Sequence, residues 1–156
     1  MIEAGQTLPA RTQRVTAHHI VSGAIASRDW APQHHDESYA RSMRLPGIIM
    51  NTPTQLGWYS AFVTNWAGPK ARAARWRIEM KKPVIAGADL TMTGRVERTA
   101  RAGDGLLWVW LRCRMTDDAA QDLGAAHLLF CIAEGPDADP WLIEEDAWAP
   151  PELQEL

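Results

Sequence analysis

The segment from residue 48 to residue 70 constrains the fold of this chain more than any other part of the sequence. It reads IIMNTPTQLGWYSAFVTNWAGPK and carries a start signal and a stop signal for a helix. Thr52 is a good N-cap, and Pro53 suits the first helical position, where its missing N–H costs no hydrogen bond. Gly68 suits the left-handed residue that follows a helix, and Pro69 prevents continuation. The segment therefore predicts a helix between these two signals.

Apolar side chains cover most of the circumference of this predicted helix, which spans residues 53–66. They are Leu56, Trp58, Tyr59, Ala61, Phe62, Val63 and Trp66. The helix would be roughly 21 Å long at 1.5 Å per residue. A helix that is apolar on nearly every side is enclosed by other structure. We therefore expect a central helix wrapped by the rest of the chain.

The residues after this helix show the two-residue period of β-strands. Residues 74–80 alternate between apolar and charged side chains, and residues 90–96 alternate again between one face and the other. Residues 106–115 and 126–133 are long apolar runs, and Asp104-Gly105 before the first of them is a hairpin signal. Three or four consecutive antiparallel strands after one buried helix indicate an α+β fold whose sheet curls around the helix.

The residues before the central helix predict three shorter elements. Residues 12–17 alternate as a short strand, and residues 18–30 have the apolar spacing of a helix. This helix should end near Trp30, because Pro32 disfavours helical geometry in the residue before it. Residues 36–43 predict a second short helix with Asp36 as its N-cap.

Length and charge narrow the class of protein. A chain of 156 residues is expected to form one domain, residues 1–156. A net charge of −3 argues against the basic face of a nucleic-acid binder. The apolar runs fall short of the roughly 20 residues of a membrane span, and no apolar leader precedes the first elements. We therefore expect a cytoplasmic protein with neither nucleic acid nor membrane as partner.

Two further features complete this outline. Cys113 and Cys131 lie in apolar strand-like runs without metal-ligand spacing, so two buried thiols are expected rather than a disulfide. From about residue 135 the chain is rich in proline and acidic residues and predicts a tail on the surface. Trp141 and Trp148 are candidates to pin this tail to the sheet.

The stretch RDWAPQHHD, residues 28–36, carries the residues best suited to chemistry. Asp29 and His34 are five residues apart, and a turn at Pro32 can fold the imidazole back over the helix end. A carboxylate and an imidazole that face one volume can hold a water and move its proton. The alternative is a solvated loop. His34-His35, with His18-His19, lacks the spacing of a metal site, so no metal is expected.

A basic cluster follows the central helix. Lys70, Arg72 and Arg75 are candidates to bind phosphate groups, because guanidinium and ammonium groups pair well with phosphate oxygens. The alternative interpretation is a solvated sheet edge. The sequence alone leaves both interpretations open.

The stretches SRDWAPQHHDESYA and GIIMNTPTQLG resemble the signature of MaoC-like (R)-specific enoyl-CoA hydratases, which have the hot-dog fold. Asp29, Pro32, His34 and Asp36 stand at the offsets of the family motif Asp-x-Asn-Pro-x-His-x-Asp. The RD…HHD form and the WAGP helix ending resemble in particular the hydratase subunits of bacterial steroid side-chain degradation. The resemblance covers residues from about 15 to 133. It implies a single hot-dog domain, a curled antiparallel sheet wrapped around a long central helix.

The sequence departs from the family pattern at two places. Ala31 stands where the motif has Asn, so a side-chain hydrogen bond that could orient the site is lost. Met50-Asn51 stands where many members have His-Gly at the start of the central helix. Asn51 can still offer its backbone N–H, with less backbone freedom than glycine.

The resemblance implies hydration of a trans-2-enoyl-CoA to a (R)-3-hydroxyacyl-CoA, with a bulky or steroid-derived acyl group as one option. Asp29 and His34 would be catalytic, and the backbone N–H groups of Asn51 and Thr52 would stabilise the thioester oxygen. Pro32 and Asp36 would support the loop, and the basic cluster of Lys70, Arg72 and Arg75 could bind the phosphates of coenzyme A. No metal or organic cofactor is implied, because the thioester itself acidifies C2.

The resemblance also implies pairing with another subunit. One hot-dog domain leaves a strand edge and one side of the helix open, so a homodimer or a heteromer with a related hot-dog subunit is expected. Two rival functions remain. One is an acyl-CoA thioesterase, and the other is a non-catalytic subunit that binds acyl thioesters, which the loss of Asn at position 31 favours.

Overall fold

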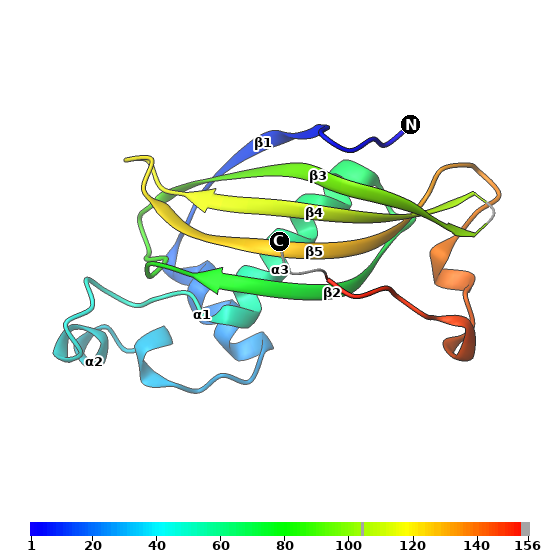
Figure 1. Ribbon diagram of the computed structural model, residues 1–156. Helices are drawn as coiled ribbons and strands as arrows, with labels where there is room; N and C mark the ends of the chain where they lie inside the picture. Colours follow the sequence, from blue (N-terminus) through cyan, green and yellow to red (C-terminus); the bar gives the residue numbers. More distant parts are fainter. Residues whose placement is uncertain (104, 154–156) are drawn as a thin grey trace.

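Helix α3 (Thr52–Ala67) lies against one face of a five-stranded antiparallel sheet in the computed structural model, which describes residues 1–103 and 105–153 (Figure 1). The strands occur in the order β1-β3-β4-β5-β2, so β1 and β2 form the two edges. Their bounds are β1 (Thr7–Arg14), β2 (Ala71–Met80), β3 (Asp89–Gly103), β4 (Leu106–Thr116) and β5 (Asp122–Ala133). The predicted α+β class, with a sheet curved around one helix, is confirmed.

The ends of α3 differ slightly from the prediction. Asn51 is the N-cap instead of Thr52, because its side-chain oxygen accepts a hydrogen bond from the Thr54 backbone N–H at 3.2 Å. Thr52 is therefore the first helical residue. The C-terminal prediction is confirmed, since Gly68 has a positive φ of 87° and ends the helix.

The sheet covers only one side of α3. The buried residues of the helix are Gln55, Tyr59, Phe62 and Val63, whereas Ala61 is exposed and Trp58 is half-buried. The other side of the helix is only partly covered, as expected for one hot-dog domain. The reason is geometric, because one curved sheet reaches around only part of a helix.

Packing between α3 and the sheet is tight at Gly94 on β3. A Cβ atom at this position would lie 2.9 Å from Cε1 of Phe62 and 3.1 Å from Cδ2 of Leu8. The neighbours of Gly94 on the same face of β3, Met92 and Val96, are fully buried. The absence of a side chain at residue 94 lets the aromatic ring of α3 rest directly on the strand.

The segment that precedes α3 carries helices α1 (Ala17–Ala26) and α2 (Glu37–Ser42) with the short 3₁₀ helix η1 (Pro32–His34) between them. The predicted strand at 12–17 is wrong in position, since β1 occupies residues 7–14. The predicted end of α1 near Trp30 is also wrong. The helix stops at Ala26 because the Ser27 hydroxyl donates to the Gly23 carbonyl at 2.7 Å and Arg28 has a left-handed φ of 55°.

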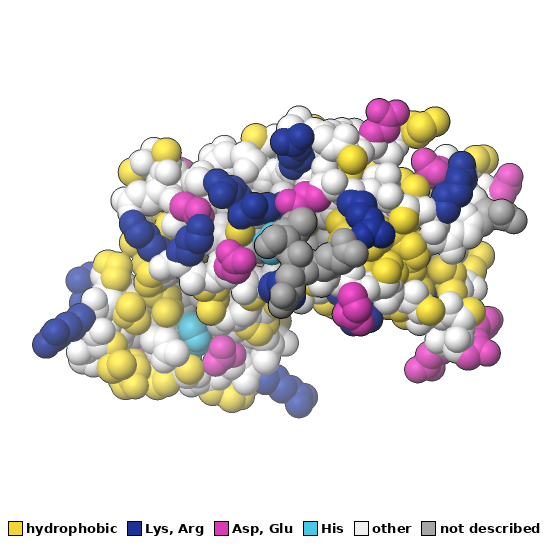
Figure 2. Space-filling view, viewed as in Figure 1, with side chains coloured by type: hydrophobic (Ala, Val, Ile, Leu, Met, Phe, Trp, Pro, Cys, Tyr) yellow, Lys and Arg dark blue, Asp and Glu magenta, His cyan; other side chains and the backbone are white. Residues whose placement is uncertain are grey.

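The C-terminal segment, residues 134–153, runs along the outer face of the sheet, opposite α3 (Figure 1). It contains η2 (Pro140–Leu142) and η3 (Glu145–Ala147). Trp148 packs against Trp108 of β4 with ring centroids 5.2 Å apart, and the Trp141 indole N–H donates to the Pro69 carbonyl at 3.2 Å. The expectation that two tryptophans pin this segment is confirmed. Figure 2 views this outer face and shows acidic and basic side chains intermingled over the strands.

Smaller predictions have mixed outcomes. Cys113 and Cys131 are buried free thiols, as expected, and burial raises the pKa of Cys113 to about 12. β3 and β4 are antiparallel neighbours with Gly103 opposite Leu106, but Asp104 of the predicted hairpin lies outside the described residues. Among the described residues, no helix has both the length and the apolar character needed to cross a membrane.

Candidate active site

Asp29 and His34 face each other at the N-terminal end of α3. The Nε2 atom of His34 lies 3.3 Å from Oδ2 of Asp29. The turn between them is η1, in which the His34 backbone N–H donates to the Ala31 carbonyl at 3.1 Å. The predicted meeting of these two side chains is observed. Their catalytic role stays a prediction.

Local backbone features position Asp29 at the end of α1. The Asp29 backbone N–H donates to the Ala24 carbonyl at 2.9 Å, which closes the end of α1. Arg28, the residue before Asp29, has a left-handed φ of 55°. The Ala31 backbone N–H donates to Oδ1 at 3.3 Å. The side chain remains 32% exposed, so a small molecule can reach it from solvent.

His34 is fixed from its other ring nitrogen. Nδ1 lies 2.7 Å from the carbonyl oxygen of Ile49. A carbonyl only accepts hydrogen bonds, so Nδ1 carries a proton and Nε2 is the nitrogen that faces Asp29. Ile49 is itself held by a β-bridge to Ile85. The imidazole, only 7% exposed, therefore has one orientation in the site.

Asn51 completes the site through its side chain, a role that the sequence analysis missed. Its Nδ2 donates to Asp29 Oδ2 at 3.0 Å and to Ser27 Oγ at 2.8 Å. Its Oδ1 accepts hydrogen bonds from the backbone N–H and the hydroxyl of Thr54. The residue is 3% exposed. The available signal was the N-cap position, which favours asparagine.

These contacts keep Asp29 ionised. The Asn51 hydrogen bond is the largest cause of a pKa below the ordinary value of 3.8; partial burial opposes it, and the Ala31 N–H and the His34 ring add to the lowering. At neutral pH, Asp29 is therefore a carboxylate that can accept a proton.

The predicted oxyanion donors lie beside this pair. Thr52 is the first residue of α3, where an α-helix leaves its N–H groups without intrahelical partners and carries partial positive charge. Asn51 precedes it as the cap. The Thr52 hydroxyl donates to the sulfur of Met80, at the end of edge strand β2, at 3.2 Å. The oxyanion role of the Asn51 and Thr52 backbone stays a prediction.

Pro32 and Asp36 shape the loop from outside the pair. The Pro32 carbonyl accepts hydrogen bonds from the backbone N–H groups of His35 at 3.0 Å and Asp36 at 2.8 Å. The Asp36 carboxylate caps α2 by accepting from the Tyr39 N–H at 3.0 Å. The predicted N-cap is therefore observed, and both residues act on the position of η1 rather than on the site itself.

The predicted phosphate ligands have a different partner in the structure. Lys70 donates to the carbonyls of Pro136 and Ala138 at 2.6 and 3.0 Å. The guanidinium carbon of Arg72 lies 3.8 Å from the centroid of the Trp148 ring. All these partners belong to the C-terminal segment.

Arg75 binds the same segment. It donates to the carbonyls of Pro151 and Pro150 at 2.9 and 3.1 Å and pairs with Glu152 at 2.8 Å. A β-bulge between Ala73 and Arg75 places Arg75 on the same outer face as Arg72. Phosphate binding by these residues stays a prediction, and it would require the C-terminal segment to release their donors.

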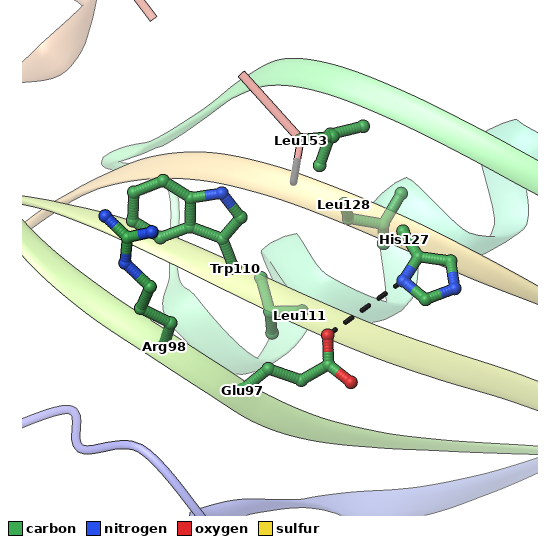
Figure 3. Close-up of a pocket in the computed structure, with 7 residues that line it drawn as sticks. All are labelled: Glu97, Arg98, Trp110, Leu111, His127, Leu128 and Leu153. Carbon is green, nitrogen blue, oxygen red and sulfur yellow. Dashed lines mark ion pairs between the residues drawn. The ribbon is translucent and has the colours of Figure 1, made fainter. Parts of the chain in front are cut away.

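A pocket of about 250 Å³ also lies on this outer face, with the C-terminal segment as part of its rim (Figure 3). His127 of β5 lies in it, with Nδ1 3.9 Å from Glu97 and Nε2 3.7 Å from Glu79. Its side chain is 14% exposed. The sheet separates this pocket from α3 and hence from Asp29.

The chain is similar to several known hydratases and hydratase subunits. A 3-oxo-4,17-pregnadiene-20-carboxyl-CoA hydratase beta subunit of Mycobacterium tuberculosis is 32% identical over 109 residues, which cover 70% of this chain and 82% of that protein. The ChsH1-ChsH2 complex of the same organism contains a chain with a TM-score of 0.77 and 26% identity, covering 85% of this chain and 99% of that chain.

A second solved structure has a similar fold. The (R)-hydratase PhaJ1 of Pseudomonas aeruginosa has a TM-score of 0.76 with 20% identity, over 86% of this chain and 84% of that chain. These likenesses confirm the expected hot-dog fold. A family model described as a MaoC like domain matches residues 2–106, most of the chain. The chain therefore belongs to the MaoC-like domain family.

Proposed function

We propose that this chain is a subunit of an enoyl-CoA hydratase that converts a trans-2-enoyl-CoA to a (R)-3-hydroxyacyl-CoA. It would carry the catalytic pair, Asp29 and His34. The observation that carries the proposal is the 3.3 Å approach of His34 Nε2 to Asp29 Oδ2 beside the N-terminus of α3. An ionised carboxylate and an oriented imidazole can hold one water between them and the substrate.

We propose the following reaction at this pair of side chains. A water held by Asp29 and His34 adds its oxygen to C3 and leaves a proton on the pair. The electrons of the double bond move to C2 and the thioester oxygen, and the pair returns a proton to C2. Asp29 is the expected base and His34 the expected acid. The first-turn N–H groups of α3 at Asn51 and Thr52 would stabilise the charge on the thioester oxygen.

The substrate and the partner are proposed from the relatives. The relative of 32% identity is named as a steroid-type CoA hydratase beta subunit, and a structural relative was solved as a complex of two different chains. We propose a bulky, steroid-like enoyl-CoA as substrate and a related hot-dog subunit as partner.

The surface next to the pair supports a partner. Trp30 is 64% exposed and Met80 is 55% exposed, and both lie close to the site in sequence or through contacts. Figure 2 shows apolar side chains gathered over the α1–α2 segment. Exposed apolar surface of this kind is typical of subunit interfaces.

A hydration assay tests the proposal. The chain, alone and in the complex purified from its native cells, is incubated with short, long and steroid enoyl-CoA while the conjugated enoyl absorbance is followed. We expect hydration whose rate falls by at least about 100-fold in Asp29→Asn and in His34→Ala. Release of free thiol from saturated acyl-CoA would instead identify a thioesterase. A native complex whose hydration survives both substitutions would identify this chain as a non-catalytic subunit.

A further inference from the structure

Asn51 connects the candidate catalytic carboxylate to the start of α3. Its amide nitrogen donates to Oδ2 of Asp29, the same oxygen that lies 3.3 Å from His34. Its amide oxygen caps the helix through the Thr54 backbone N–H. One buried side chain therefore ties the position of the carboxylate to the helix that would receive the thioester oxygen.

The orientation of this amide is fixed by chemistry. The Thr54 backbone N–H can only donate, so the atom of Asn51 that faces it must be the oxygen. The nitrogen must then face Ser27 and Asp29. Because the residue is 3% exposed, water has little access to replace either contact.

We infer that Asn51 is a positioning residue for Asp29, and that its amide replaces the one lost at Ala31. This inference rests on the proposed hydratase function. Ala31 contributes only a backbone N–H, at 3.3 Å from Oδ1, where the family motif carries an asparagine side chain. Asn51 supplies a side-chain donor to the other oxygen, from the position where many family members have glycine.

A purely structural role for Asn51 makes a different prediction. An N-cap needs only the side-chain oxygen, so serine or aspartate at residue 51 would cap α3 about as well as asparagine. Neither supplies an amide donor to Asp29. Asn51→Asp also places a second carboxylate beside the first, and like charges raise a carboxyl pKa. Capping and positioning can therefore be separated by these two substitutions.

The experiment compares Asn51→Ser and Asn51→Asp with the wild-type chain in steady-state hydration across pH. We expect kcat to fall on the order of 10- to 100-fold, with the larger loss in Asn51→Asp, because a misplaced catalytic group costs rate. KM should change little. The acidic limb of the pH profile should move to higher pH, since the pKa of Asp29 loses its main lowering contact.

A rescue variant sharpens the test. Ala31→Asn restores the family residue next to Asp29, so the double variant Ala31→Asn/Asn51→Ser should regain most of the lost kcat and the wild-type acidic limb. A merely structural defect at the start of α3 would not respond to residue 31. Loss of kcat without a shifted limb and without rescue would overturn the inference.

A second readout does not depend on activity. Carbon-13 NMR titration of the Asp29 carboxyl, assigned with the Asp29→Asn variant, should give a pKa below 3.8 in the wild type and a higher value in Asn51→Ser. If no enoyl-CoA is hydrated but this shift is seen, the proposed function fails and the positioning role of Asn51 stands. An unchanged pKa in Asn51→Ser would refute the positioning role even in an active enzyme.

Discussion

The two faces of the sheet use charged residues in opposite ways. On the α3 side, Asp29 meets His34 within a segment that is local in sequence, and each polar atom of the pair has a defined partner. On the outer side, Lys70 and Arg72 reach carbonyls some 70 residues away, in the C-terminal segment. When two functional side chains are separated by one short turn, their spacing in the sequence predicts that they meet. The sequence of a basic cluster on a strand does not show which anion or carbonyl the cluster binds.

The largest effect is expected on the hydration rate, when the Asp29 carboxylate on the α3 side is removed. Asp29→Asn is expected to lower the hydration rate by roughly 10²- to 10⁴-fold, because it removes a general base. The fold should persist, since the asparagine side chain is nearly isosteric and partly exposed. Initial rates and circular dichroism would check both points. An unchanged rate would contradict a catalytic role for the α3 side of the sheet, and the two faces would then no longer differ in function.

The next largest effect is expected on the free energy of unfolding, when a side chain is added where α3 packs against the sheet. Gly94→Ala is expected to destabilise the protein by about 1–3 kcal/mol, because its Cβ would lie 2.9 Å from the Phe62 ring. Gly57→Ala is a matched control on α3, where no atom lies within 4 Å of the new Cβ. It should be stabilising by about 0.5–1 kcal/mol. Urea unfolding measures both, and equal effects would contradict the packing described here.

On the outer face, Arg72→Ala should weaken the attachment of the C-terminal segment. The loss is about 1 kcal/mol for a cation–π contact, added to two hydrogen bonds to Pro140 and Ile143. We expect increased proteolysis of the segment and an unchanged ratio of KM for enoyl-CoA and enoyl-pantetheine. A rise in KM for the CoA thioester alone would instead support phosphate binding at this cluster.

The smallest effect is expected from a surface carboxylate away from the site. Asp122 has a lowered pKa, chiefly because Lys81 donates to it at 2.6 Å. Its pKa is lower in the folded than in the unfolded chain, so its contribution to stability is present above the ordinary value of 3.8 and is lost as the pH falls through the folded pKa. Asp122→Asn should therefore lower stability at neutral pH and have no effect in strong acid. Urea titrations at several pH values measure this, and a pH-independent difference would contradict the ion pair.

Several elements were predictable from local rules. The stop signal at Gly68, the cap at Asp36 and the alternation along β3 all operate over a few residues, so the sequence was sufficient for them. The end of α1 was not predictable from Pro32, because the Ser27 hydroxyl and the turn at Arg28 stop the helix earlier. Several local signals can end the same helix, and the sequence does not show which of them does so first.

The sequence by itself determined the α+β class and the approach of Asp29 to His34, because helix signals, strand periodicity and a short turn depend on neighbouring residues. The hot-dog fold was implied by the resemblance to MaoC-like hydratases. Only the tertiary structure decided the partners of Asn51 and Arg72. Asn51 reaches Asp29 across 22 residues, and Arg72 reaches Trp148 of the C-terminal segment on the outer face of the sheet. Such contacts form when separate elements pack together, and no spacing within either segment specifies them.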